Sequence, residues 1–327
     1  MERLPLVSFV VPVRNDAGHL RACLASIAAD AAAAGRFEIL VADNGSTDAS
    51  RDVARAAGAL VFEWPGLTVA EMRNRAAQEA RGAVLAFVDA DHEIARGWTR
   101  GAIDALQKPG VVAAGAPYDA PRDGTWVQRL YNTLRDHSEG TSDVEWIAGG
   151  NLAVWREAFL TVGGFDTSLV TCEDVDLCKR LRGKGGRLLQ DARMRTTHFG
   201  DPATLEALFF GELWRGRDNL RAGFRTPVTL RGLPSLVIPV ADLALMVAGA
   251  AGMLGAAYGG FTIAALSLGA IAALAALRAI VMASRLPSLS FADAAGAFAV
   301  ALTYDVARAL APLWGAPHAA RRRAERR

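Results

Sequence analysis

The chain has 327 residues, and its 36 basic and 34 acidic side chains give a formal net charge of +2. This length suits one large domain with an appendage or two ordinary domains, and the near-neutral balance gives no global field that favours nucleic acid. Hydrophobic residues make up 52% of the chain, and beyond about residue 230 charges nearly vanish for roughly fifty residues. We therefore predict a globular head followed by a membrane-bound tail.

The cysteines and the N-terminal run both indicate a head that is not secreted. Cys23, Cys172 and Cys178 form neither a CxxC pair nor a zinc spacing, so we expect reduced thiols in a reducing compartment. The N-terminal apolar run is short, contains Pro12, and leads into polar Arg14 without a small-residue cleavage site. This pattern favours a first buried strand over a secretory signal.

The head begins with apolar, β-rich runs that alternate with helical stretches. The predicted strands are Val7–Val13, Phe37–Ala42, Ala59–Glu63 and Ala83–Val88. The predicted helices between them span Ala17–Ala33, Ala49–Ala57 and Thr68–Ala80. This order predicts an α/β fold with a doubly wound, mainly parallel sheet. The pattern is less regular after a strand at Val111–Ala116, with helices expected at Trp126–Asp136 and Thr204–Ala222.

Acidic loops follow two of the predicted strands. Asp43 comes after the second strand, and Asp89 and Asp91 come after the fourth. In open parallel sheets, ligands bind at the carboxyl ends of the strands. We therefore expect these three carboxylates to face one binding site.

Six segments resemble the motifs of family 2 glycosyltransferases with the GT-A fold. They are VSFVVPVRND at the start, VADNGSTDAS at 41–50, AFVDADHE at 86–93, GGNLAV at 149–154, GGFDTSL at 163–169 and CEDVDLCKRL at 172–181. One D-x-D triplet arises often by chance, whereas several motifs in the family's order are specific. The resemblance covers about residues 5–200 and implies an inverting, metal-dependent transfer from a nucleotide-sugar donor. We place the GT-A domain at 1–225 and a membrane domain at 226–327.

The resemblance implies a site for Mg²⁺ or Mn²⁺, which neutralises the diphosphate of the donor. Hard cations of this kind take few protein carboxylates, with phosphate oxygens as further ligands. Asp91 is the expected metal ligand, and Asp89 is expected to contact the ribose or share the metal. His198 stands where relatives supply a third ligand, with His92 a second candidate, although a lone histidine is more often an ordinary hydrogen-bonded residue. The alternative is that Asp89 and Asp91 have no metal-binding role and only cap the next helix.

The donor nucleotide has its own expected contacts. The resemblance implies that Asp43 accepts a hydrogen bond from the imide N–H of the base, whereas Asn44 departs from the family's usual aspartate. Pro12 and Arg14 are expected to line the base pocket. Arg73 is expected either to approach the nucleotide or to lie on a solvated helix face.

Asp174 is the predicted general base. An inverting displacement needs one carboxylate to remove the proton of the acceptor hydroxyl, and the resemblance gives Asp174 this role with Glu173 beside it. Both acids lie in the first turn of a predicted helix, where the dipole favours negative charge, so the alternative is a purely structural role. Gly149, Gly150 and Asn151 are expected to let the backbone approach the sugar or the acceptor closely.

The helix before the tail is expected to face the acceptor through Trp214 and Arg215. Its sequence from Glu212 to Arg215 lacks the glutamine of the Q-x-x-R-W signature of processive synthases and inverts the order of Arg and Trp. We therefore expect a single sugar addition to a lipid-linked or other glycan acceptor.

The tail contains three apolar stretches. Leu236–Tyr258 and Phe261–Ser284 are each long enough to cross a hydrocarbon core, and Gly259-Gly260 between them predicts a tight hairpin. Phe291–Leu313 is also long enough to span, but a third crossing would carry the basic C-terminus outward. We therefore favour an amphipathic helix at the interface, with the basic tail on lipid headgroups.

The charges around the hairpin predict its orientation. Arg225 and Arg231 precede it and Arg285 follows it, so the positive-inside rule places the head on the cytoplasmic side of the inner membrane. Asp242 and Arg278 lie at nearly the same depth of the two spans. We expect them to pair, to share a lipid headgroup, or to snorkel independently.

Two other functions are compatible with such a fold. A sugar-nucleotidyltransferase would carry a glycine-rich, arginine-containing phosphate loop after the first strand, where this chain has a single Gly18. A catalytically silent membrane scaffold would keep the fold while losing the acids, which are all present here. Both therefore fit the residues less well than a glycosyltransferase.

Overall fold

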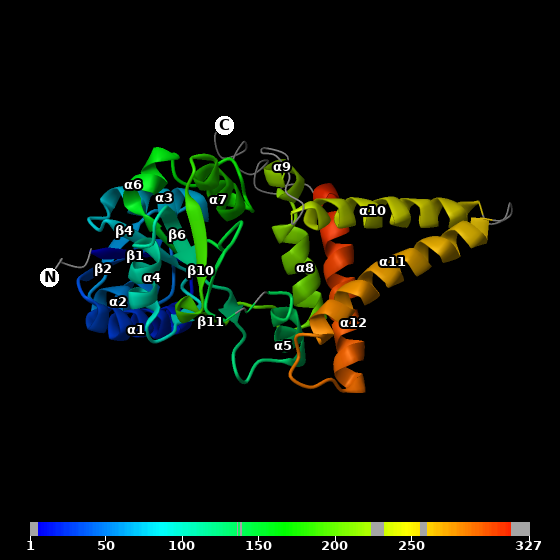
Figure 1. Cartoon of the computed structure of the whole chain (residues 1–327), viewed down its shortest axis with the longest axis horizontal. Helices are drawn as coiled ribbons and strands as arrows, with labels where there is room; N and C mark the ends of the chain where they lie inside the picture. Colours follow the sequence, from blue (N-terminus) through cyan, green and yellow to red (C-terminus); the bar gives the residue numbers. More distant parts are fainter. Residues whose placement is uncertain (1–5, 136, 138, 224–231, 256–259, 315–327) are drawn as a thin grey trace. The chain divides into compact units, whose positions relative to one another are not determined.

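The computed structural model describes residues 6–135, 137, 139–223, 232–255 and 260–314 (Figure 1). The chain forms two compact units: unit 1 contains Met1–Asp123 and Arg135–Asp201, and unit 2 contains Gly124–Leu134 and Pro202–Arg327. It therefore passes between the units three times. The predicted domain boundary at 225, Arg225 and Arg231 before the predicted hairpin, Gly259 of its predicted turn and the basic tail at 315–327 lie outside the described residues.

Unit 1 is built on an eight-stranded sheet with the order β3-β2-β1-β4-β9-β6-β10-β8. The strands are β1 (Val7–Val13), β2 (Phe37–Asp43), β3 (Leu60–Glu63), β4 (Val84–Val88), β6 (Val111–Gly115), β8 (Thr141–Asp143), β9 (Asn151–Trp155) and β10 (Arg187–Asp191). Strands β1 to β4 pair with one another in parallel, and β10 is parallel to β6. The predicted, mainly parallel sheet is thus confirmed. The antiparallel β9, which lies between β4 and β6, was not predicted.

Helices cover both faces of this sheet (Figure 1). One face packs against α1 (Ala17–Ala34), α2 (Ser50–Ala56) and α4 (Trp98–Leu106), and the other against α3 (Val69–Glu79), α6 (Arg156–Thr161) and α7 (Glu173–Gly183). Alternate residues of each strand serve the two cores, because successive side chains point to opposite faces. In β1, Phe9 and Val11 belong to the first core and Val10 to the second. This double burial explains the continuous apolar runs of the sequence.

A second, three-stranded sheet lies in unit 1. Its order is β5-β11-β7, with β5 (His92–Ile94) antiparallel and β7 (Tyr118–Asp119) parallel to β11 (Thr196–His198). The antiparallel register places His198 directly opposite His92. These strands have two or three residues each, which is too short for a periodic pattern in the sequence.

The described part of unit 2 is helical. Its helices are α5 (Trp126–Asn132), α8 (Leu205–Arg215), α9 (Asn219–Gly223), α10 (Leu233–Leu254), α11 (Gly260–Ala283), α12 (Phe291–Leu310) and the 3₁₀ turn η3 (Ala311–Leu313). The segments Leu233–Leu254, Gly260–Ala283 and Phe291–Leu313 are long and apolar enough to cross a membrane. Residues of α5, α8, α11 and α12 share one apolar cluster, so the helix predicted at 126–136 packs with the C-terminal helices.

The charges inside these apolar helices pair differently from the prediction. Arg278 forms a salt bridge at 2.8 Å with Asp305 of α12 rather than with Asp242. The Arg278 guanidinium also lies 4.8 Å from the ring centre of Tyr304. Asp242 is buried, and its carboxylate oxygens have no hydrogen-bond partner within the described parts of the chain. The negative charge that pairs with Arg278 therefore comes from α12, whereas we had expected it from Asp242 of the hairpin.

Candidate functional site

The acidic residues lie at one edge of the large sheet. Strands β1, β2 and β4 are parallel, so their carboxyl ends meet at that edge. Asp43 is the last residue of β2, and Asp89 follows directly after β4. The backbone N–H of Asp89 donates to the carbonyl of Gly150 at 3.2 Å, just before β9. The edge therefore brings together two of the sequence segments that resemble catalytic motifs.

Arg73 of α3 joins two of the acids. Its guanidinium donates to Asp89 at 2.5 Å and to Glu173 at 3.2 Å. The side chain is only 3% exposed, so it does not lie on a solvated helix face. Burial, reinforced by the neighbouring Asp174, raises the pKa of Glu173 to about 7. Arg73 thus holds the loop after β4 and the start of α7 in one arrangement.

Asp174 lies beside this ion-pair network, in the first turn of α7. The backbone N–H groups of Gly149 and Val175 donate to its two carboxylate oxygens, at 3.0 and 2.8 Å. Burial raises the pKa of Asp174, although these hydrogen bonds oppose the shift. A buried carboxylate with a raised pKa, held by backbone donors, has the properties of a general base.

The glycine pair at 149–150 is required by close packing against these side chains. A Cβ on Gly149 would lie 2.8 Å from a guanidinium nitrogen of Arg73 and 3.3 Å from the Cβ of Asp174. A Cβ on Gly150 would overlap the carboxylate of Asp89. The two glycines therefore let this segment approach the acidic residues of the chain itself.

Asn151 is fully engaged within the protein. Its side-chain oxygen accepts from the indole N–H of Trp98 at 2.7 Å, and its amide donates to the carbonyls of Ala116 and Met194 at 2.8 Å each. The residue has no exposed surface. These bonds tie together the start of β9, the end of β6 and the segment before β11, which is a structural role.

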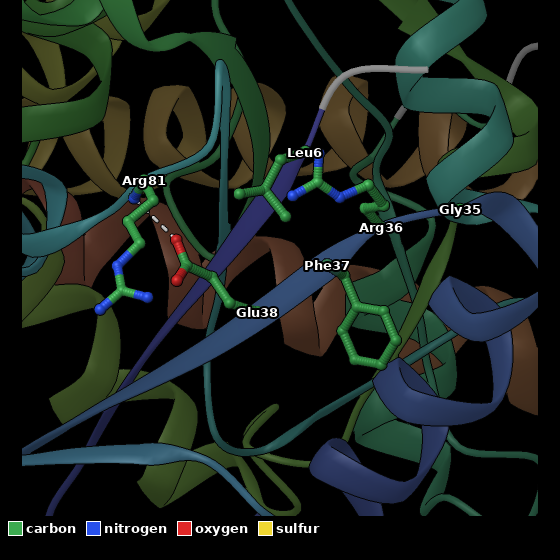
Figure 2. Close-up of a pocket in the computed structure, with 6 residues that line it drawn as sticks. All are labelled: Leu6, Gly35, Arg36, Phe37, Glu38 and Arg81. Atoms are coloured by element: carbon green, nitrogen blue, oxygen red, sulfur yellow. Dashed lines mark hydrogen bonds between the residues drawn. The ribbon is translucent and has the colours of Figure 1, made fainter. Parts of the chain in front are cut away.

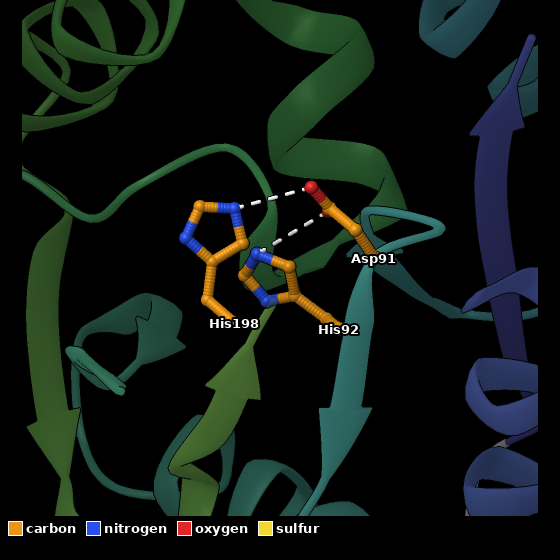
Figure 3. Close-up of side chains that lie close together, drawn as sticks. All are labelled: Asp91, His92 and His198. Carbon is orange, nitrogen blue, oxygen red and sulfur yellow. Dashed lines mark ion pairs between the residues drawn. The ribbon is translucent and has the colours of Figure 1, made fainter. Parts of the chain in front are cut away.

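Asp91, His92 and His198 form a cluster with the properties of a cation site (Figure 3). One potential ligand atom from each of them lies within 4.8 Å of the others. The Nε2 atom of His198 is 3.3 Å and that of His92 is 3.9 Å from the Asp91 carboxylate. His92 Nε2 is buried and has no hydrogen-bond partner among the residues that the structure describes. A Cβ on Gly200 would overlap Asp91 and lie 2.9 Å from His198 Nε2, so the backbone leaves this space open.

The protonation of the cluster follows from its charges. Burial opposes protonation of His198, but hydrogen bonds with Asp201 and Asp91 outweigh it and raise the pKa to about 9. Burial and the neighbouring His198 lower the pKa of His92 to about 4. Burial disfavours the charged form of Asp91, but its hydrogen bond with His198 lowers the pKa to about 2. The carboxylate is therefore ionised, and a bound cation would replace a proton on His198.

Asp43 offers a second unsatisfied group at the same edge. Its Oδ1 accepts from the N–H of Ser46 at 2.9 Å, and its Oδ2 is buried without a hydrogen-bond partner in the described segments. The side chain of Asn44 bonds to the backbone of the loop after β3. Pro12 is buried in β1 opposite Ala42, one position before the pair of Val13 and Asp43, and Arg14 is exposed. The free oxygen of Asp43 suits a ligand that donates a hydrogen bond.

Two further predicted residues, Trp214 and Arg215, belong to unit 2. Trp214 is 48% exposed on α8. Arg215 forms a salt bridge at 3.0 Å with the buried Glu212, which also accepts from Tyr131 and Arg308. Unit 1 contains the acidic cluster, and these two residues are grouped with the apolar helices instead.

Three residues beside the cation cluster were not predicted from the sequence. Tyr118 of β7 packs against both histidines, and its ring centre is 4.5 Å from that of His92. Asp201 and Arg135 form a buried salt bridge that also contacts His198. Arg135 and Asp201 are 66 residues apart, so no local sequence motif predicts their pairing.

A shallow hollow of about 490 Å³ lies at the other end of the strands (Figure 2). Its lining residues are Leu6, Gly35, Arg36, Phe37, Glu38 and Arg81. Glu38, near the start of β2, accepts from the hydroxyl of Ser8 and from the backbone N–H of Arg81. Because Asp43 ends the same strand, this hollow is separate from the acidic edge.

Part of the chain is similar to known proteins. Residues 8–162 match the family model described as glycosyl transferase family 2. Glycosyltransferase AglE of Haloferax volcanii is 28% identical over 191 residues, which are 56% of this chain and 63% of that protein. The chain thus spans less than two thirds of the length of this relative.

Solved structures share the fold. A mannosyltransferase of Pyrobaculum calidifontis, PcManGT, in complex with GDP-Man and Mn²⁺, matches with a TM-score of 0.67 and 22% identity, over 96% of this chain and 88% of its own. GalNAc-T7 with UDP, GalNAc and Mn²⁺ matches with a TM-score of 0.51 and 20% identity, over 65% of this chain and 49% of its own. The core is thus a GT-A-like, mostly parallel sheet, followed by three apolar helices.

Proposed function

Because residues 8–162 match the family model described as glycosyl transferase family 2, we propose that the chain transfers a sugar from a nucleotide-sugar donor to a membrane-associated acceptor. The acceptor is a lipid-linked sugar or another glycan, and each reaction adds one sugar with inversion at the reacting carbon. The observation that carries the proposal is the gathering of acids at one sheet edge, where Arg73 joins Asp89 to Glu173 beside Asp174.

The cluster of Asp91, His92 and His198 fits a divalent cation. Such a cation would neutralise the diphosphate of the donor as the bond to the sugar breaks. Mg²⁺ prefers an octahedral shell of oxygens, whereas Mn²⁺ accepts imidazole nitrogen more readily. The presence of Mn²⁺ with both structural relatives supports the same choice. We therefore propose Mn²⁺ as the preferred metal. Asp91 and His198 are its proposed ligands, and His92 is a further candidate ligand.

Asp174 is the proposed general base. The acceptor hydroxyl attacks the sugar carbon from the face opposite the leaving nucleotide, and its proton passes to a carboxylate oxygen of Asp174. The raised pKa of Asp174 makes its carboxylate a stronger base than an exposed aspartate. Its bonds from Gly149 and Val175 fix the orientation of that carboxylate. No covalent intermediate is needed.

The remaining predicted residues have proposed roles on the donor side. Asp43 accepts the N–H of the base through its unpaired oxygen, with Pro12 and Arg14 at the same strand end. Arg73 holds Asp89 next to the donor. These roles put the nucleotide at the ends of β1, β2 and β4, as expected for ligands of open parallel sheets.

The apolar helices support an acceptor at the bilayer. We propose that α10 and α11 cross the inner membrane and that unit 1 faces the cytoplasm, where nucleotide-sugars are made. The chain places Arg285 directly after α11, which supports this orientation under the positive-inside rule. Trp214 and Arg215 are proposed to contact the acceptor from α8.

Metal removal tests the proposal directly. Treatment of the purified full chain with EDTA is expected to reduce its hydrolysis and transfer of radiolabelled nucleotide-sugars to background, across a panel of UDP-, GDP- and dTDP-sugars. Mn²⁺ is expected to restore the activity more fully than Mg²⁺, because imidazole nitrogens are among the ligands. Activity that survives EDTA would contradict the metal role. Formation of a nucleoside triphosphate and a sugar 1-phosphate when pyrophosphate is added, instead of release of a nucleoside diphosphate, would indicate a nucleotidyltransferase. No turnover with any donor would indicate a silent scaffold.

Gly150→Ala is expected to lower the transfer rate by about a hundredfold, because a misplacement of about 1 Å costs that much in an active site. The added Cβ overlaps the carboxylate of Asp89, which must move away from Arg73. Initial rates measured at saturating donor check this. The matched control is Gly18→Ala in α1, where nothing lies within 4 Å of the new Cβ; equal rates for the two variants would refute the close-packing argument.

A further inference from the structure

Asp201 is a buried carboxylate, and both of its oxygens bind partners that lie next to the cation cluster. His198 Nδ1 donates to Oδ1 at 2.8 Å, and Arg135 donates to both oxygens at 2.6 Å each. The Asp201 side chain has no exposed surface. A bidentate pair of this kind fixes the plane of the carboxylate. Asp201 therefore cannot turn away from His198 without breaking two charge-assisted bonds.

Tyr118 completes the enclosure of the His198 ring. The Arg135 guanidinium lies 5.0 Å from the Tyr118 ring centre, and that ring centre is 5.1 Å from the His198 ring. The His198 imidazole is thus fixed by a hydrogen bond at Nδ1 and by the contact with Tyr118. In this arrangement its Nε2 atom lies 3.3 Å from the Asp91 carboxylate (Figure 3).

The hydrogen bond decides which ring nitrogen of His198 is available. An ionised carboxylate only accepts hydrogen bonds, and the two bonds from Arg135 keep Asp201 ionised. The proton of a neutral His198 must then lie on Nδ1, where Asp201 accepts it. The lone pair on Nε2 is left for a ligand, and metal-binding histidines are commonly oriented by a carboxylate in this way.

We propose that Asp201 and Arg135 are positioning residues that hold His198 in the tautomer and orientation needed to bind the divalent cation through Nε2. The proposal rests on the proposed function, because it assumes a cation at Asp91 and His198. Arg135 is the first residue of unit 1 after α5, and Asp201 is the last residue before Pro202. The pair therefore also joins the residue at which the chain returns to unit 1 and the residue at which it leaves unit 1 for the second time.

Asp201→Asn in the full chain tests this proposal. In the asparagine variant one of the two acceptor oxygens becomes an N–H₂ donor, which faces a donor of Arg135 and, in one of the two amide orientations, also His198 Nδ1. In both orientations His198 loses the ionised carboxylate and the bidentate pair that hold its ring, and Mn²⁺ affinity is expected to fall about 10- to 100-fold. Electron paramagnetic resonance titration of Mn²⁺ measures the affinity. ¹⁵N-histidine NMR of the metal-free protein reports the tautomer when it is recorded above the His198 pKa of about 9, where the ring is neutral.

Asp191→Asn is the matched control. Asp191 is also a buried aspartate of unit 1 with a bidentate arginine partner, Arg193, and it does not contact the cluster. We expect wild-type Mn²⁺ affinity and tautomer in this variant. Equal Mn²⁺ affinities for Asp201→Asn and Asp191→Asn would overturn the positioning role alone. A wild-type protein that binds no Mn²⁺ would overturn the metal site itself. A neutral wild-type His198 with its single proton on Nε2 would overturn the inference even if Asp201→Asn failed to fold.

Discussion

Asp174→Asn is expected to lower the rate of sugar transfer by about a thousandfold, within the range of about 10²–10⁴ that a positioned general base contributes. The amide keeps the shape of the side chain but cannot take the proton of the acceptor. Donor affinity should stay near that of the wild type, because the base acts on the acceptor. Separate measurement of kcat and of the dissociation constant for the nucleotide-sugar checks both parts.

The pH dependence of the wild type provides a second measure of the same residue. Transfer requires the Asp174 carboxylate, so the rate should fall as the pH drops through its pKa. Because burial raises that pKa, the acid limb should lie above the range of an exposed aspartate. In the asparagine variant this limb should disappear from any residual rate.

Asp176→Asn controls for the loss of an acid from the same helix. Asp176 is also in the first turn of α7, and it forms a salt bridge with Arg180 at 2.7 Å. This variant should keep its transfer rate within a few-fold of the wild type, with any loss appearing as lower stability. If Asp174→Asn were no slower than Asp176→Asn, another group would have to remove the proton.

Asp91→Ala is expected to cost about a thousandfold in transfer and most of the affinity for Mn²⁺. A metal contributes several kcal/mol of charge stabilisation, and about 4 kcal/mol corresponds to that fold change. Asp91 contacts His198 and faces His92, so its removal leaves only imidazoles at the site. Transfer assays over a series of Mn²⁺ concentrations and direct Mn²⁺ titration provide the two readouts.

Asp119→Ala is the matched control for this variant. Asp119 lies in β7 of the same small sheet, is 42% exposed, and faces His137 rather than the cluster. Its removal should leave Mn²⁺ binding unchanged. Full activity of Asp91→Ala at low Mn²⁺ concentration would show that Asp91 is not a ligand.

The sequence predicted the parts of the fold that have a local pattern. Strands such as Val7–Val13 are buried on both faces, so they appear as continuous apolar runs with clear ends. The antiparallel β9 was missed because it is inserted between β4 and β6 from a distant part of the chain. Its apolar residues look like those of any short buried segment.

For the candidate site, too, the sequence predicted what has a local pattern and missed contacts between distant segments. Asp43, Asp89 and Asp91 follow predicted strands, so the topology of the sheet alone places them at one edge. The link from Arg73 to Glu173 joins residues 100 positions apart, and nothing local to α3 predicts it. Asn151 belongs to the GGNLAV motif at 149–154. Its hydrogen bonds with Trp98 and with two backbone carbonyls, however, depend on segments outside that motif.

The packing of α5 against α12 has a consequence for the order in which the protein is made. Val127 and Leu130 of α5 share an apolar cluster with Val300 of α12, and Arg129 forms a salt bridge with Asp293, 164 residues later. A ribosome therefore synthesises Asp293 only 164 residues after Arg129. Until then the apolar face of α5 is without that partner, and the last strands of the large sheet, β8, β9 and β10, are synthesised in the meantime.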